Sequence, residues 1–206
     1  QKSKNVKVLY CSSGAVYGQQ PQNVKNISES LDFLPLNSLE PEKRIYAKGK
    51  RKAEKKILEL SSHGFSCVIA RCFSFYGKYL PKDQHFAYGN FVKMAELKKD
   101  IVVKAKNCVY RSYMSADDLV ISLFILLKIA NEKMSIFNVG SSKSILIHDL
   151  ADKIAAKFGV KVIKNDIDET LPYDSYIPNV NKLKKACNNF QPKLDIKTLM
   201  HFHLLK

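Results

Sequence analysis

The sequence lacks any uninterrupted run of the eighteen or so apolar residues that a membrane-spanning helix requires. The longest candidate, residues 119–130, is too short to cross a bilayer, and we expect it to be a buried helix. The chain opens Gln-Lys-Ser-Lys-Asn and shows no signal-peptide pattern. These absences argue against a membrane protein and favour a cytoplasmic setting.

Cysteines at metal-binding or redox spacing are also missing. The five cysteines are an odd number, with no Cys-x-x-Cys pair and no histidine at ligand spacing: Cys11, Cys67, Cys72, Cys108 and Cys187. This pattern argues against a disulfide framework and a zinc site. We expect no metal site and cysteines that are mostly reduced and buried.

Acidic residues are scarce: 19 Asp and Glu stand against 34 Lys and Arg, which gives a formal charge of +15. Such an excess suits nucleic-acid binding, because lysines neutralise phosphates. However, the lysines are scattered through expected helices and loops, and no nucleic-acid motif accompanies them. We therefore favour a lysine-rich soluble surface and expect no nucleic-acid partner, while noting that a phosphorylated small substrate would also be attracted.

The order of the first elements predicts an α/β fold. Residues 6–11 form a short strand pattern that ends in a Ser-Ser-Gly turn, and a polar loop follows from 19 to about 41. Residues 46–60 have a helical pattern, and 65–70 are a continuous apolar run typical of a buried parallel strand. Strand, loop, helix and strand in this order are typical of α/β proteins.

The later elements continue this alternation. Ser115 has the character of a helix N-cap, since Asp117 and Asp118 follow in the first turn. The expected elements are a helix at 90–97, strands at 101–103 and 110–114, a helix from 115 to about 131, a strand at 136–139, a helix at 147–158, a strand at 160–163, and weak helices at 180–186 and 195–203.

Three polar segments stand where catalytic groups are expected. They are Ser-Ser-Gly-Ala-Val-Tyr-Gly at 12–18, Tyr-Ala-Lys-Gly-Lys at 46–50 and Arg-Cys-Phe-Ser-Phe-Tyr-Gly at 71–77. The first and third close predicted strands, and the second begins a helix. Because ligands of open α/β sheets bind outside the carboxyl ends of strands, all three segments could border one crevice.

Tyr46 and Lys50 are spaced for one site, because residues four apart share a helix face. An ammonium group beside a phenol favours the phenolate, so Tyr46 could exchange a proton with a sugar hydroxyl while Ser13 orients the same oxygen. Each motif alone has a simpler explanation: a solvated helix face for Tyr46 and Lys50, and a plain turn for Ser13.

Together these segments resemble the signatures of extended short-chain dehydrogenases that act on nucleotide sugars, the NAD-dependent epimerase/dehydratase family. Three later segments are similar to further signatures of the family: Gly89-Asn90-Phe91, the Arg-x-Tyr-x-x-x-Asp-Asp segment from Arg111 to Asp118, and Asn-Val-Gly-Ser at 138–141. The resemblance extends from about residue 6 to about 197.

The resemblance implies the C-terminal part of a Rossmann-like doubly wound parallel sheet plus a small α/β substrate-binding domain. Residues 1–77, with 115–140 returning to it, would form the second half of the dinucleotide-binding domain. Residues 78–114 and 141–206 would form mainly the substrate domain.

The same resemblance implies the roles of individual residues. Ser13, Tyr46 and Lys50 would be catalytic, and the expected cofactor, NAD or NADP, would contact Tyr46, Lys50, Cys72 and Phe73. A nucleotide-diphosphate sugar would contact Ser12, Ser74, Asn90, Phe91, Arg111 and Tyr113. Arg111 and Asn90 would hold the diphosphate, an arginine fork being suited to phosphate oxygens; the alternatives are a surface ion pair for Arg111 and a helix cap for Asn90. A homodimer through the helices near 46–60 and 90–97 is a family expectation.

The sequence also departs from the family pattern. Its eight glycines, at 14, 18, 49, 64, 77, 89, 140 and 159, include no Gly-x-x-Gly-x-x-Gly trio of the kind that binds a pyrophosphate. The chain begins about where the family's fifth strand stands, so three strand–helix units, roughly 100 residues, are missing from it. Gly14 and Ala15 replace the Asp-Glu pair of family 4,6-dehydratases, which disfavours dehydration, and Ser74 replaces a common Asn.

Two enzymatic functions fit these motifs equally: a 4-epimerase, and a reductase of 4-keto nucleotide sugars. The alternative from another class is a non-catalytic or inactive truncated fragment that binds a nucleotide or an acidic partner. Intact Ser13, Tyr46 and Lys50 favour the enzyme.

Overall fold

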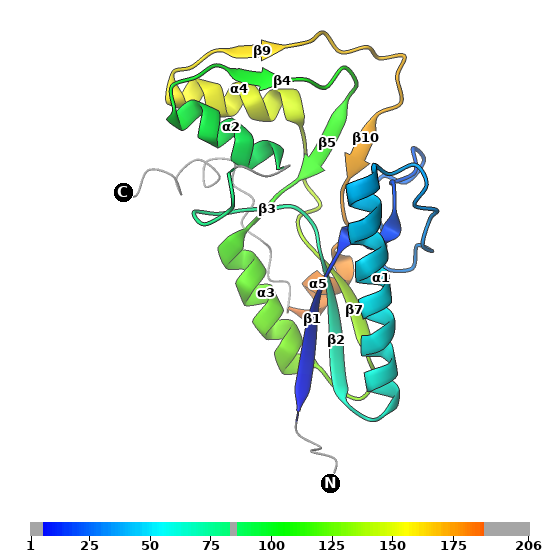
Figure 1. Cartoon of the computed structure of the whole chain (residues 1–206). Helices are drawn as coiled ribbons and strands as arrows, with labels where there is room; N and C mark the ends of the chain where they lie inside the picture. The colour runs from blue at the N-terminus through cyan, green and yellow to red at the C-terminus, as the bar shows by residue number, and fades with distance from the viewer. Residues whose placement is uncertain (1–5, 83–85, 188–206) are drawn as a thin grey trace.

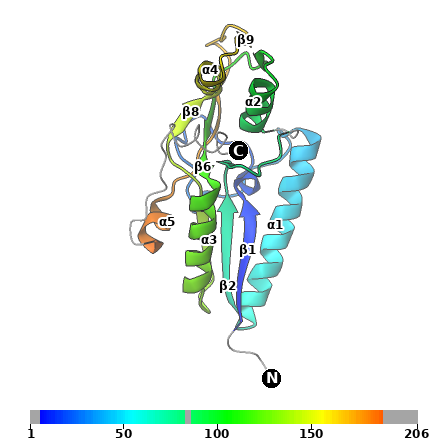
Figure 2. The ribbon, with the colours of Figure 1, turned by 90° about the vertical axis from the view of Figure 1, so that its left-hand side faces the viewer.

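The computed structural model describes residues 6–82 and 86–187 and has the α/β architecture that the sequence predicts. Three parallel strands form one sheet in the order β1-β2-β7: β1 (Lys7–Ser13), β2 (Ser66–Cys72) and β7 (Ser135–Val139). Helices α1 (Pro41–Ser62) and α3 (Ala116–Ile129) lie on opposite faces of this sheet (Figure 2). Parallel strands between two layers of helices are the Rossmann-like arrangement expected from the sequence.

The register of the sheet aligns the carboxyl ends of its strands. Ser13 lies opposite Cys72 in the β1–β2 pair, and Arg71 lies opposite Asn138 in the β2–β7 pair. The polar segments that follow these strands therefore emerge at the same edge, as the sequence predicts. The short 3-10 helix η1 (Gly14–Tyr17) begins directly after β1 at this edge.

A second group of elements lies beyond that edge, at the top of Figure 1. Its helices are α2 (Ala87–Glu96) and α4 (Ile147–Phe158), and its paired strands are β4 (Ile101–Val103) and β9 (Val162–Lys164). A small sheet has the order β10-β5-β8: β10 (Asp174–Tyr176), β5 (Val109–Ser112) and β8 (Ser144–Leu146). The pair β3 (Phe75–Tyr76) and β6 (Met114–Ser115) links the two groups, and α5 (Asn181–Ala186) packs against β7.

Each group has its own buried cluster. One surrounds α2 and α4 and includes Phe91, Ile101 and Leu150. The other lies between the parallel sheet, α3 and α5 and includes Phe137 and Leu126. The division of the chain into two domains remains a prediction. The two separate buried clusters are compatible with it.

Two helices begin earlier than the sequence predicts. Helix α4 has the predicted bounds, whereas α1 begins five residues earlier than expected, at Pro41, because proline suits the first helical position. Helix α2 begins at Ala87 rather than near Asn90. The short strands β3, β8 and β10 were not predicted, and the helix expected at 195–203 lies outside the described residues.

The expectation that residues 119–130 form a buried helix is wrong. Only one side of α3 contacts the sheet, and the side chain of Phe124 is 69% exposed, with Val120 and Ile121 also exposed. Within residues 6–82 and 86–187, no helix is long and apolar enough to cross a membrane.

The cysteines are free, as expected, but most of them are not buried. Cys67 and Cys187 are buried, Cys72 and Cys108 are half-buried, and Cys11 is exposed. The exposure of Cys11 follows from its place on β1, the edge strand of the parallel sheet.

The N-cap of α3 gives a first prediction. The Ser115 hydroxyl accepts a hydrogen bond from the Asp118 backbone N–H at 3.0 Å in a buried position. Ser115→Ala leaves that N–H without its acceptor and is expected to lower the free energy of unfolding by about 1 kcal/mol. Urea unfolding measures this, with the exposed loop variant Ser142→Ala as the control, expected within a few tenths of a kcal/mol of the wild type. Equal stability of the two variants would contradict the role of the cap.

Candidate active site

The site begins with two consecutive serines at the end of β1. Ser13 is the N-cap of η1, and its Oγ accepts a hydrogen bond from the Ala15 backbone N–H at 3.2 Å. Ser12 faces α1, where its Oγ donates to Glu54 Oε1 at 2.5 Å. Because neighbouring residues of a strand point to opposite faces, the two hydroxyls have different partners. The hydroxyl of Ser12, which the sequence predicts to contact substrate, therefore donates its hydrogen bond to Glu54.

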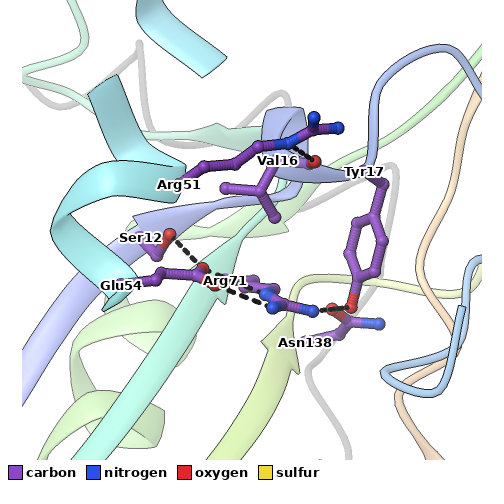
Figure 3. A network of polar contacts seen from close by, with 7 residues as sticks. All are labelled: Ser12, Val16, Tyr17, Arg51, Glu54, Arg71 and Asn138. Atoms are coloured by element: carbon purple, nitrogen blue, oxygen red, sulfur yellow. Dashed lines mark hydrogen bonds and ion pairs between the residues drawn. The ribbon is translucent and has the colours of Figure 1, made fainter. Parts of the chain in front are cut away.

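A buried ion pair lies beside Ser12 (Figure 3). Arg71 on β2 donates from Nε and Nη2 to the two carboxylate oxygens of Glu54, at 3.0 and 2.7 Å. The remaining nitrogen of the fork, Nη1, donates to the Tyr17 hydroxyl at 2.8 Å, and that hydroxyl donates to Asn138 Oδ1 at 2.8 Å. This network joins α1, β1, β2, β7 and η1.

The network determines the ionisation of its members. Burial alone would lower the pKa of Arg71, but the hydrogen bonds to Glu54 and Tyr17 outweigh burial and raise it. Burial raises the pKa of Tyr17 despite the opposing effect of Arg71. Arg71 is therefore a permanent cation and Tyr17 a neutral phenol, so the network supports the site without exchanging protons.

Tyr46 and Lys50 lie on one side of α1, as their spacing predicts. Lys50 Nζ donates to the Cys11 carbonyl oxygen at 2.8 Å and stands 5.7 Å from the centroid of the Tyr46 ring. The Tyr46 side chain is 52% exposed. The structure thus brings the predicted phenol and ammonium together on an accessible face at the end of β1.

The structure adds a residue that the sequence did not indicate, Tyr176 on β10. Its ring stacks on Phe73 with 4.5 Å between centroids, and its hydroxyl lies within hydrogen-bonding reach of Ser13. Burial raises the pKa of Tyr176, against the smaller opposing effect of the hydrogen bond with Ser13. The C-terminal part of the chain therefore contributes directly to the site. Tyr176 lies in a stretch for which the sequence predicts no strand, and the pairing of residues 174–176 with β5 makes it one.

Gly14 is required by the close packing of this corner. A Cβ atom on Gly14 would lie 2.6 Å from the Phe73 ring and 2.6 Å from the Tyr176 hydroxyl, well inside contact distance. A larger side chain at this position therefore needs both aromatic residues to move. An aspartate, which family 4,6-dehydratases carry at the position of Gly14, would not fit here while Phe73 and Tyr176 keep their places.

The predicted diphosphate residues occupy the second group of elements. Arg111 Nη2 donates to Asp174 Oδ2 at 2.5 Å, so it forms the partly exposed ion pair that the sequence left as an alternative. Asn90 lies inside α2, where its backbone N–H donates to the Phe86 carbonyl; the helix-cap alternative is therefore wrong.

A cavity of about 480 Å³ lies between α2 and β4. Asn90 and Phe91 line it together with Met94, Val103 and Ile147. The remaining predicted residues lie outside it. Tyr113 is buried against the Tyr88 ring, and burial raises its pKa to about 12. The Ser74 carbonyl accepts a hydrogen bond from the Met114 N–H at 3.1 Å.

No group of His, Cys, Asp and Glu side chains suited to a metal ion occurs within the described ranges, 6–82 and 86–187. The polar groups gathered at the strand ends are instead hydroxyls, the Lys50 ammonium, the Asn138 amide and the ion pair of Glu54 with Arg71. Such groups position hydroxyl and phosphate oxygens and move protons.

A family model for the NAD-dependent epimerase/dehydratase family matches residues 1–140. The chain belongs to this family. The resemblance of the sequence motifs is thereby confirmed, and the expected cofactor class, NAD or NADP, agrees with the description of the family.

Several solved structures share the fold of this epimerase/dehydratase family member. The chain is similar to a dTDP-glucose 4,6-dehydratase from Bacillus anthracis in complex with NAD, with 18% identity, a TM-score of 0.76, and coverage of 98% of this chain and 61% of that one. A UDP-glucose 4-epimerase from Thermotoga maritima with UDP-glucose has 16% identity, a TM-score of 0.77 and coverage of 93% and 60%. RMD from Pseudomonas aeruginosa, complexed with NADPH, has 23% identity, a TM-score of 0.77 and coverage of 98% and 66%.

The chain thus spans less than two thirds of the length of these structures, and at these identities they show the fold alone. No curated protein matches the chain.

Two glycines of the site predict opposite effects of the same substitution. Gly14→Ala forces a methyl group against Phe73 and Tyr176 and is expected to lower the free energy of unfolding by about 1–3 kcal/mol. Gly49→Ala lies inside α1 with nothing within 4 Å of its Cβ, and is expected to raise it by about 0.5–1 kcal/mol. Urea unfolding of the two variants measures both; a neutral or stabilising Gly14→Ala would contradict the packing at this corner.

Proposed function

We propose that the chain forms the proton-relay and substrate-binding part of an NAD(P)-dependent enzyme that acts on a nucleotide-diphosphate sugar, as a 4-epimerase or a 4-keto-sugar reductase. The observation that carries this proposal is the convergence on Tyr176. Its hydroxyl lies within hydrogen-bonding reach of Ser13 at the end of β1, its ring stacks on Phe73 after β2, and it lies opposite Arg111 in the pairing of β10 with β5. Four separate segments of the chain thus meet at Tyr176.

The proposed relay uses the open face of α1. Tyr46 would take or give the proton of the sugar C4 hydroxyl, Ser13 would hold the same oxygen, and Lys50 would stabilise the phenolate through its charge. The nearness of Lys50 to Tyr46 supports this assignment. The 4-epimerase and the 4-keto reductase need the same three groups, so the proposal includes both.

The hydrogen-bond donors of Lys50 and Tyr46 fit the nicotinamide end of the cofactor. Lys50 and Tyr46 present an ammonium and a hydroxyl on an accessible surface, where they can bind ribose hydroxyls. Cys72 and Phe73 lie at the end of the adjacent strand and would border the same space. The bound cofactor would supply the hydride acceptor or donor. The sequence has no glycine trio for the pyrophosphate, so this chain accounts for only one end of the cofactor site.

The substrate would extend from the relay toward the second group of elements. Arg111 is already held in place by Asp174 and by the Tyr110 carbonyl, and it would present its remaining N–H donors, on Nε and Nη2, to the diphosphate. Asn90 and Phe91 line the 480 Å³ cavity, which is of a size for a nucleoside. This division supports a nucleotide-diphosphate sugar whose sugar lies near Ser13 and whose base lies near α2.

Dimerisation and localisation remain predictions. Helix α1 leaves most of its surface free, since only Ala47 and Glu54 are buried in it. That surface is available to a second copy of the chain, as the family expectation requires.

The relay predicts the effect of one hydroxyl. In an assay of 4-epimerisation and of 4-keto reduction with NAD(H) and NADP(H), Tyr46→Phe is expected to lower kcat by about 10²–10⁴-fold, because the proton donor and acceptor is lost. Affinity for uridine diphosphate, which Tyr46 does not contact in this proposal, should stay unchanged. The matched control is Tyr79→Phe, which removes the hydroxyl of a tyrosine that is 89% exposed and should retain full turnover. Unreduced turnover in Tyr46→Phe would remove this residue from the proton role.

The binding-protein alternative is separated by calorimetric titration with NADH, NADPH and uridine diphosphate of the whole enzyme of which this chain is proposed to be the relay and substrate-binding part. The enzyme proposal expects saturable binding of a dinucleotide together with turnover. Binding of uridine diphosphate without dinucleotide binding or turnover would favour the non-catalytic alternative.

A further inference from the structure

Tyr176 is restrained beside the relay serine both by its backbone and by its ring. Its strand, β10, pairs with β5, and in this pairing Tyr176 lies opposite Arg111. The Tyr176 ring stacks on Phe73 with 4.5 Å between the ring centroids and 31° between the ring planes. Because strand pairing and ring stacking act on the same residue, the phenol hydroxyl is confined to one position.

That position is defined by Gly14, the residue that follows Ser13. Tyr176 Oη lies 2.6 Å from the place that a Cβ atom of Gly14 would occupy, which is inside contact distance. The absence of a side chain at Gly14 therefore lets the phenol approach the end of β1 this closely. Ser13 Oγ lies within hydrogen-bonding reach of the same phenol. The hydroxyls of Ser13 and Tyr176 are thus neighbours.

The hydrogen-bonding capacity of Ser13 decides what this contact does. A serine hydroxyl has two lone pairs and one hydrogen. One lone pair of Ser13 accepts from the Ala15 backbone N–H at 3.2 Å. Burial raises the pKa of Tyr176, so its phenol keeps its proton at neutral pH and is able to donate to the second lone pair. With both lone pairs occupied, Ser13 has only its hydrogen left to offer, and the sugar oxygen of the proposed relay accepts it.

We propose that Tyr176 is a positioning residue, which donates a hydrogen bond to Ser13 and thereby directs the Ser13 hydroxyl hydrogen toward the sugar oxygen. This inference rests on the proposed function, because it requires Ser13 to hold that oxygen. Tyr176 acts through Ser13 and exchanges no proton with the substrate. Strand β10, which the sequence does not predict, thereby gains a role in the relay.

The opposite direction of this hydrogen bond would have the opposite consequence. If Ser13 donated to the phenol oxygen, its one hydrogen would be withheld from the sugar, and loss of the phenol hydroxyl would leave turnover unchanged or raise it. If Tyr176 donates, the same loss leaves Ser13 free to turn its hydrogen away from the sugar, and turnover falls. Tyr176→Phe separates the two cases, since it keeps the ring against Phe73 and removes only the hydroxyl.

The experiment is a double-mutant cycle in kcat on the whole enzyme of which this chain is proposed to be a part, assayed for 4-epimerisation and 4-keto reduction. Ser13→Ala is expected to lower kcat about 10²–10³-fold. Tyr176→Phe should lower kcat about 3- to 10-fold, because one neutral hydrogen bond is lost, and should change the KM for the nucleotide sugar less than about 2-fold. In the Ser13→Ala background, Tyr176→Phe should lower kcat by less than about 2-fold more.

The matched control is Tyr173→Phe, which removes another phenol hydroxyl from the segment that leads into β10. The Tyr173 hydroxyl donates to the Gln22 carbonyl, outside the relay, so this variant should keep the kcat of the wild type. An equal fall of kcat in Tyr173→Phe and Tyr176→Phe would assign both losses to the packing of this segment and would overturn the inference.

Two further results would overturn the inference while the relay stands. One is a kcat that is unchanged or raised in Tyr176→Phe although Ser13→Ala is impaired. The other is the same fold-loss from Tyr176→Phe with Ser13 present and with Ser13 replaced. Full turnover in Ser13→Ala, or no turnover in the wild type, would instead contradict the proposed function itself, and the inference with it.

Discussion

The buried ion pair between Glu54 and Arg71 is the interaction on which the candidate site depends. Two charges removed from water are costly unless each of their hydrogen-bonding groups is satisfied. Here Glu54 accepts from Ser12 as well as from Arg71, and the third nitrogen of the Arg71 fork donates to Tyr17. The charges are therefore fully paired, and the pair can hold a helix and two strands in a single arrangement.

The pair orients the helix that carries the proposed relay. Tyr46, Lys50 and Glu54 are spaced four residues apart, so they lie along one face of α1. Since Glu54 is held against Arg71, the same face is directed toward the end of β1, where Lys50 reaches the carbonyl of Cys11. The network continues through Tyr17 to Asn138, whose Nδ2 donates to the Ile27 carbonyl at 2.9 Å. The loop after η1 is thereby attached to the sheet.

Much of this architecture was predictable because its signals are local. The cap at Ser115, the apolar run of β2 and the amphipathic pattern of α4 each depend on a few neighbouring residues, and each is found in the structure. The spacing of Tyr46 and Lys50 likewise follows from helix geometry alone.

The features that the sequence did not reveal depend on distant partners. Strand β10 exists because β5 pairs with it, and Tyr176 enters the site only through that pairing. The partner of Arg71 is a glutamate on α1, and no spacing rule links a helix residue to a strand residue. The exposure of one side of α3 was not predicted for the same reason. An apolar run does not indicate how many sides of its helix will pack against other elements. The roles of Ser13, Tyr46 and Lys50 remain predictions that the arrangement supports.

The coupling between Glu54 and Arg71 is the most direct measure of this account. A double-mutant cycle would compare Glu54→Gln, Arg71→Met and the double variant by urea unfolding. Each single change is expected to cost about 3–5 kcal/mol, because it leaves one buried charge without its partner. The double variant should cost at least about 2 kcal/mol less than the sum of the two single changes. Additive effects, or single changes that each cost under about 1 kcal/mol, would contradict the claim that this pair organises the site.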